Sequence, residues 1–253
     1  MQFLTYRRWF YSIVFSFSFA ACQRPLLPTA ALPPDTDIKL DAAIPADSTS
    51  EALILPYRQQ MAQQMNAVLG VSAQELLRVG AGESALGNFV AEVQMVEALP
   101  LYKKPIDMSL MTTGGLRANI PQGPVTLSHI FELLPFENQL VVVTLPGTAV
   151  QKMFDQAARN QELIIQNATF TIKEAKPVNI LINRQPLAPQ KKYKIVMSDY
   201  LANGGDDLSF MKEATAVEPV GLMAREALIK HIRELTAQEK PIKAHVDGRM
   251  KVQ

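Results

Sequence analysis

The stretch "YKIVMSDYLANGGDDL", residues 193–208, joins a strand-like run to a turn rich in glycine and short polar side chains. Aromatic and β-branched residues at its start favour a strand. Gly204 and Gly205 then allow positive φ and leave room for another group to approach the backbone, and an asparagine and two aspartates surround them. Two interpretations stay open at this point: a turn capped by its own Asx side chains, or a turn that binds a ligand.

The N-terminus has the pattern of an export signal. Arg7 and Arg8 precede the apolar run "WFYSIVFSFSFAA", which ends at Cys22 and is too short for an ordinary membrane span. This pattern predicts a signal peptide over residues 1–21. Cys22 is the only cysteine of the chain and follows "FAA", which resembles the lipobox of bacterial lipoproteins. We therefore expect lipidation at Cys22 and an exported protein anchored to a membrane by lipid, on the periplasmic or cell-surface side; plain cleavage and an uncleaved anchor are the alternatives.

Residues 22–50 have the composition of a linker. They lack a long apolar periodicity and contain five prolines, which favour an extended spacer between a lipid-bearing end and a folded domain. "STSE", Ser48 to Glu51, has the spacing of a helix-starting capping box. Apolar residues at helical spacing follow it, and Gly70 is the predicted stop of this helix. The apolar residues are Ile54, Tyr57, Met61, Met65 and Val68.

Downstream, helical and strand-like apolar patterns alternate without a strict β-α-β rhythm. This order predicts one α+β domain over residues 51–253, with mixed β-sheets flanked by helices. The 25 basic and 24 acidic residues are spread along the chain, and the sequence contains no basic block and no interleaving of basic and aromatic residues, so we expect no nucleic-acid partner. The expected helices cover about 83–99, 129–134, 147–157 and 222–235, and the expected strands cover 106–110, 140–145, 168–172, 178–182 and 193–197.

Four segments in order carry a resemblance to a known family. They are "GESALGNFVAEVQ", "TTGGLRANIPQGPVT", "LLPFENQLVVVTLPG" and "YKIVMSDYLANGGDDL". Their order and spacing resemble the C-terminal domain of the 5'-nucleotidase family, which includes UDP-sugar hydrolases. The similarity runs from about residue 38 to the last helix.

The resemblance implies a nucleoside site that includes the glycine-rich turn. In this family, two aromatic side chains stack on the faces of the base, and the matching residues here are Phe136 and Tyr200. Such stacking contributes about 1–3 kcal/mol per base in related proteins. Asn138 matches a side chain that reaches the edge of the base. Without the family, ordinary core packing is the simpler interpretation of each ring.

The resemblance also implies polar contacts to the sugar and the phosphate. Asp206 matches a carboxylate that accepts hydrogen bonds from the ribose hydroxyl groups, and Asn203 belongs to the same turn. Arg117 matches an arginine that contacts phosphate, for which a guanidinium group is well shaped; a surface arginine in a loop is the alternative. A nucleotide or nucleoside is therefore the expected ligand.

The chain departs from the family pattern at several positions. Thr112 and Thr113 replace an asparagine and a glycine, and the acidic residues Glu137 and Asp207 are added near the presumed site. Added carboxylates weaken the binding of a multiply charged phosphate, so the resemblance supports the nucleoside part of the site better than the phosphate part.

Family enzymes also carry an N-terminal metallophosphatase domain, whose two metal ions activate water. The D-x-H and G-N-H-D motifs of such a domain do not occur in this sequence, whose three histidines are His129, His231 and His245. We therefore expect no catalytic residue, metal site or cofactor in this chain, and divalent metals in a partner phosphatase chain.

Three functions remain open. The first is the nucleotide- or nucleoside-recognition component of a 5'-nucleotidase-type hydrolase in nucleotide catabolism, working with a separate metallophosphatase subunit. The second is a non-catalytic surface lipoprotein that binds nucleosides or nucleotides. The third is a structural protein that keeps the fold without the site.

Overall fold

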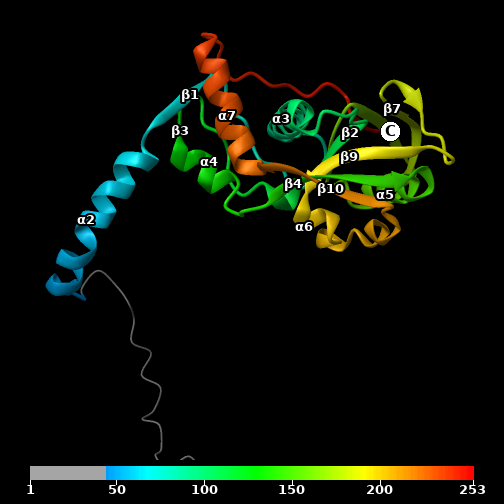
Figure 1. Cartoon of the computed structure of the whole chain (residues 1–253). Helices are drawn as coiled ribbons and strands as arrows, with labels where there is room; N and C mark the ends of the chain where they lie inside the picture. The colour runs from blue at the N-terminus through cyan, green and yellow to red at the C-terminus, as the bar shows by residue number, and fades with distance from the viewer. Residues whose placement is uncertain (1–43) are drawn as a thin grey trace, which may run out of the picture. The chain divides into compact units, whose positions relative to one another are not determined.

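The computed structural model describes residues 44–253 and contains three β-sheets with helices packed against them (Figure 1). The predicted α+β fold with mixed sheets is confirmed. The chain divides into two units, residues 1–52 and 53–253.

The helices are α2 Ser48–Met65, α3 Ala85–Tyr102, η2 Thr113–Gly115, α4 Leu127–Leu133, α5 Gly147–Asn160, α6 Asp199–Ala202, η3 Gly205–Asp207, η4 Ser209–Glu213 and α7 Ala224–Ala237. The strands are β1 Val68–Ser72, β2 Met108–Thr112, β3 Gly123–Thr126, β4 Gln139–Pro146, β5 Leu163–Gln166, β6 Ala168–Lys173, β7 Lys176–Ile182, β8 Gln185–Pro186, β9 Lys192–Ser198, β10 Ala216–Met223 and β11 Met250–Val252.

The central sheet has the strand order β10-β4-β9-β2-β5, and its inner strands β4, β9 and β2 are buried on both faces. Strand β9 pairs antiparallel with β4 and parallel with β2, which makes the sheet mixed. Side chains of β4 alternate between two cores, because successive residues of a strand point to opposite faces. Leu140 and Val142 enter the first core, and Val141, Val143 and Leu145 enter the second.

Helices cover the two faces of this sheet. Helices α3 and α7 supply the first core, while α5 and the sheet β11-β6-β7-β8 supply the second, so α3 and α5 lie on opposite sides (Figure 1). Helix α3 begins where the side chain of Ser84 accepts a hydrogen bond from the backbone N–H of Gly87, which is a typical N-cap. Its contact with β2 brings the middle of α3 close to the glycine-rich η2 turn.

The prediction for the first helix was wrong at its C-terminal end. Helix α2 ends at Met65, and Gly70 lies inside β1. A Cβ atom at Gly70 would lie 2.6 Å from the Thr236 hydroxyl and 2.8 Å from an Ile232 methyl group. The glycine therefore lets β1 approach α7 and does not stop a helix. No side chain of α2 is buried, and its apolar residues Ile54, Tyr57 and Met61 are all exposed.

The predicted signal peptide, residues 1–21, and Cys22 lie outside the described residues, as does most of the predicted linker. None of the helices in residues 44–253 is both long and apolar enough to span a membrane.

Candidate functional site

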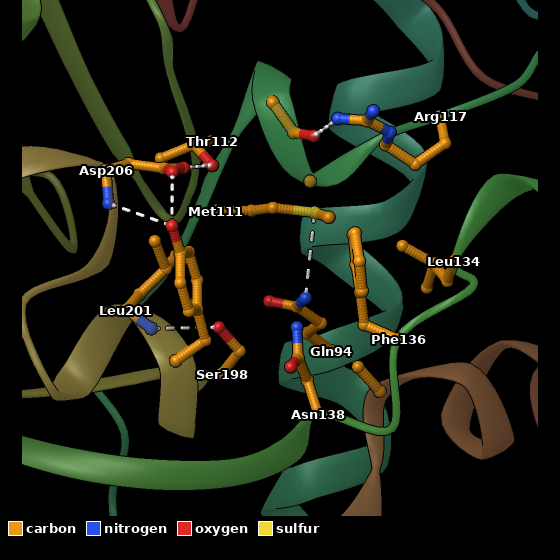
Figure 2. A pocket seen from close by; sticks show the side chains of 14 residues that line it. Gln94, Met111, Thr112, Arg117, Leu134, Phe136, Asn138, Ser198, Leu201 and Asp206 are labelled. Carbon is orange, nitrogen blue, oxygen red and sulfur yellow. Dashed lines mark hydrogen bonds between the residues drawn. The ribbon is translucent and has the colours of Figure 1, made fainter. Parts of the chain in front are cut away.

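A cavity of about 270 Å³ opens beside the end of the central sheet (Figure 2). Segments from five parts of the chain meet there: the middle of α3, the end of β2 with η2, the turn before β4, the segment from the end of β9 to η3, and the start of α7. Five of the six predicted binding residues line it, and Asn203 does not. The lining residues are Gln94, Met111, Thr112, Gly114, Gly115, Arg117, Leu134, Phe136, Asn138, Ser198, Tyr200, Leu201, Asp206 and Ala224.

Asn203 ends the short helix that carries Tyr200. The strand does not run directly into the turn, because α6 intervenes after the N-cap Ser198. The backbone N–H of Asn203 donates to the carbonyl of Asp199, and Gly204 follows with φ +88°. The side chain of Asn203 is exposed and does not line the cavity, and no side-chain hydrogen bond caps η3, the helical turn that follows it.

Gly205 allows the turn to pack against the ring of Tyr200. A Cβ atom at Gly205 would lie 2.5 Å from two ring carbons of Tyr200. The backbone N–H of Asp206 donates to the Tyr200 hydroxyl at 3.3 Å. The second glycine therefore serves close approach, and it brings the tyrosine ring and the following aspartate together.

Both carboxylate oxygens of Asp206 are held in place. One accepts from the Tyr200 hydroxyl at 2.9 Å and the other from the Thr112 hydroxyl at 2.5 Å (Figure 2). Asp206 has φ +53°, a conformation that Asp tolerates better than most residues. Each carboxylate oxygen keeps a second lone pair for a ligand hydroxyl. Thr112, which the sequence offered only as a departure from the family pattern, therefore orients the predicted sugar-binding group.

Phe136 and Arg117 belong to another part of the cavity wall. Phe136 is half exposed, as is Tyr200, so neither ring has a purely structural place in the core. The Arg117 guanidinium carbon lies 6.0 Å from the centre of the Phe136 ring, and its Nη1 donates to the carbonyl of Gly114 at 3.2 Å. Arg117 is exposed and lines the cavity, and these contacts leave several of its guanidinium N–H groups for an anion.

Arg225, at the start of α7, holds the turn that carries Phe136. Its Nη1 donates to the carbonyls of Leu134 and Pro135, each at 3.2 Å. Its guanidinium carbon lies 4.1 Å from the centre of the Phe131 ring, and its side chain is 6% exposed. Sequence reasoning missed this residue, because nothing near it in the chain connects it with the turn.

Asp199 joins the two aromatic walls. One of its carboxylate oxygens accepts from the backbone N–H groups of Tyr200, at 2.8 Å, and of Gln139, at 3.2 Å. Gln139 follows the cavity residue Asn138 at the start of β4, so this single carboxylate fixes the start of α6 against the Phe136 side of the site.

The cavity is chemically suited to a flat and largely uncharged ligand. Among the described residues that line it, one carries a positive charge, Arg117, and one a negative charge, Asp206. Two carboxamides, from Gln94 and Asn138, add hydrogen-bonding groups to a wall that is otherwise mainly apolar. Aromatic faces with a few convergent polar groups are typical of small-molecule sites.

A group of potential metal ligands lies elsewhere. Within residues 44–253, Glu97, His231 and Glu234 bring ligand atoms within 4.8 Å of one another, and none of them lines the cavity. The ammonium group of Lys230 hydrogen-bonds to both carboxylates, and His231 contacts Glu97 at 2.8 Å. The hydrogen bonds with Glu234 and Glu97 raise the pKa of Lys230. The ammonium group of Lys230 thus supplies the positive charge beside these carboxylates. The hydrogen bonds of the cluster connect α7 with α3.

Comparison with known proteins agrees with this architecture. Residues 66–213 match the family described as "5'-nucleotidase, C-terminal domain". A solved structure, the 5'-nucleotidase precursor of Thermus thermophilus, superimposes with a TM-score of 0.70 and 26% identity, over 83% of this chain and 44% of that chain.

Two further relatives are much longer than the segment that matches this chain. The apyrase of Tabanus yao is 23% identical over 193 residues, which cover 66% of this chain and 34% of the relative. A cell wall protein of Listeria monocytogenes is 29% identical over 187 residues, covering 66% of this chain and 23% of the relative. The chain therefore spans about a third or less of the length of these two relatives. The family match covers more than half of the described fold, and the chain belongs to the 5'-nucleotidase C-terminal domain family.

Proposed function

We propose that this chain is the nucleotide- or nucleoside-recognition component of a 5'-nucleotidase-type hydrolase. The observation that carries the proposal is the cavity itself, which Phe136, Tyr200 and Asp206 all line although 70 residues of sequence separate the first from the last. A planar base would stack on the exposed aromatic rings, and the ribose hydroxyl groups would donate to Asp206. Arg117 would meet a phosphate at the mouth of the cavity.

Hydrolysis would depend on a second chain. The relatives are longer proteins, and this chain matches about a third of the apyrase. Since the sequence lacks the metallophosphatase motifs, divalent metals would be bound by a separate phosphatase subunit, which would cleave a nucleotide held by this one.

A non-catalytic nucleoside-binding lipoprotein is the second candidate. The single guanidinium group among the described lining residues favours it, because one arginine neutralises little of the charge of a phosphate ester. In that case the neutral nucleoside would bind at least as tightly as its 5'-monophosphate.

We place the protein outside the cytoplasm, held at a membrane by lipid on Cys22. The apolar segment before Cys22 and the similarity to a cell wall protein support export. Two acyl chains would provide stable anchoring, at about 0.8 kcal/mol per buried CH₂ group.

Calorimetric titration of the purified chain with nucleosides and their 5'-monophosphates tests the proposal. We expect saturable binding of at least one nucleoside. Phe136→Ala and Tyr200→Ala should each weaken it by about 1–3 kcal/mol, because each removes one stacking face. Val252→Ala is a matched control, since this exposed side chain lies on β11 and does not line the cavity. Equal affinities of all four proteins would contradict the proposed site.

A further inference from the structure

Gln94 is a buried amide whose hydrogen-bonding capacity is only partly used. It lies on α3, is 1% exposed and lines the cavity. Its Oε1 accepts from the Ser109 hydroxyl at 3.2 Å, and its Nε2 donates to the Met111 sulfur at 3.7 Å. Thioether sulfur is a weak acceptor. Within the described part of the chain, no stronger partner satisfies the two N–H groups of this amide.

The other buried polar residues of α3 differ in this respect. Asn88 donates to Glu83 at 2.7 Å and to the carbonyl of His245 at 2.9 Å, and Glu97 contacts both Lys230 and His231. Neither of them lines the cavity. Buried polar groups in proteins normally have good partners, so the weakly paired amide that also reaches the cavity requires an explanation.

The position of Gln94 is suited to the edge of a planar ligand. Figure 2 shows its carboxamide and that of Asn138 in the same part of the cavity, close to the ring of Phe136. A ring that lies against the aromatic walls presents its edge to the polar groups between them. The N–H groups of Gln94 are matched by an acceptor, such as a ring nitrogen or an exocyclic oxygen of a nucleobase.

We propose that Gln94 is a specificity-determining residue that donates a hydrogen bond to an acceptor on the edge of the bound base. The proposal rests on the proposed function, since it takes a nucleoside as the ligand. Without ligand, the weak sulfur contact keeps the amide in place. With ligand, the second N–H gains a strong acceptor, and a base that lacks an acceptor at this position leaves a buried donor unpaired, which is the usual source of strong discrimination.

Substitutions combined with ligand analogues test this proposal. The chain is first titrated with adenosine, guanosine, inosine, uridine and cytidine. The nucleoside that binds best is then compared with its deaza or deoxygenated analogues, each of which lacks a single base acceptor. For the wild-type chain, one analogue should bind about 5- to 100-fold more weakly than the parent, as expected for an unpaired buried donor.

Gln94→Met should bind the parent nucleoside and that analogue equally, because methionine fills a similar volume without a donor. Gln185→Met, at an exposed position on β8, should retain the discrimination. Thermal unfolding of each variant checks that the fold is intact.

Two results would overturn the proposal, and they are distinguishable. If the wild-type chain binds nucleosides and Gln94→Met discriminates among the analogues as the wild type does, Gln94 is not the donor, while the proposed function stands. If neither the nucleosides of the panel nor their 5'-monophosphates bind the wild-type chain, both proposals are wrong.

Discussion

Gly205 illustrates how a residue without a side chain determines the position of two residues that have one. A Cβ atom at this position would collide with the ring of Tyr200, whose hydroxyl group contacts both the backbone and the carboxylate of Asp206. The ring, the turn and the carboxylate therefore form one unit, and a change in the turn should affect ligand binding more than folding.

Gly205→Ala tests this unit. The added methyl group would lie 2.5 Å from the Tyr200 ring, so the half-exposed ring should turn away and lose its contact with Asp206. We expect nucleoside affinity, measured by calorimetric titration, to fall about tenfold, within the range for loss of one stacking face. Gly80→Ala is the matched control, because a Cβ atom there meets nothing within 4 Å. Equal loss in both variants would contradict the account.

At the scale of single residues, local pattern and family resemblance together identified the aromatic and acidic residues of the cavity. Phe136, Tyr200 and Asp206 stand next to turns that the sequence makes visible. No turn motif points to a contact of Thr112 or Gln94. Thr112 contacts Asp206, which lies 94 residues away in sequence, and Gln94 contacts Met111, which lies 17 residues away. A buried glutamine on an apolar helix was the one available signal for Gln94.

At the scale of elements, the start of α7 acts as a clamp on the turn before β4. Arg225 donates to two carbonyls of this turn, and the backbone N–H of Ala224 donates to the carbonyl of Asn138 at 3.0 Å. The position of Phe136 therefore depends on a helix that begins 88 residues later in the chain.

Arg225→Met should loosen this clamp. The substitution keeps an apolar side chain over Phe131 but leaves the carbonyls of Leu134 and Pro135 without their donor, which costs about 1–3 kcal/mol of unfolding free energy. We expect chemical denaturation to show this loss and titration to show weaker nucleoside binding. Arg233→Met, at an exposed position on the same helix, should change neither. Unaltered stability and affinity in Arg225→Met would show that the clamp has no role.

The predictability of the elements followed the strength of their local signals. Strand β4 and helix α5 were predicted close to their observed bounds, because a continuous apolar run and a strong helical period each point to one structure. Six strands were missed. β8 and β11 have two and three residues, and β1, β3, β5 and β10 are short or polar on one face and pair with strands that are distant in sequence. Gly70 was misread for the same reason, since the atoms that require a glycine there belong to α7.

At the scale of the whole molecule, the mixed central sheet brings the walls of the cavity together. Strand β4 starts directly after the Phe136 turn, and its antiparallel partner β9 ends at Ser198, two residues before Tyr200, with Leu140 opposite Ser198. The register of this pair therefore places the two aromatic residues at the same end of the sheet. The family resemblance implied such a meeting of the two segments, and no pattern within either strand specifies it.

The central claim is that this chain recognises a nucleotide and leaves its cleavage to another protein. Calorimetric titration of the purified chain with the four common ribonucleoside 5'-monophosphates, each in the presence of Mn²⁺, tests recognition and cleavage in one measurement. The account predicts discrete heats of saturable binding, a return to baseline after each injection and no release of phosphate, with Asp206→Ala reducing the heats. A sustained heat of turnover that chelation abolishes would contradict the claim, as would the absence of any binding heat.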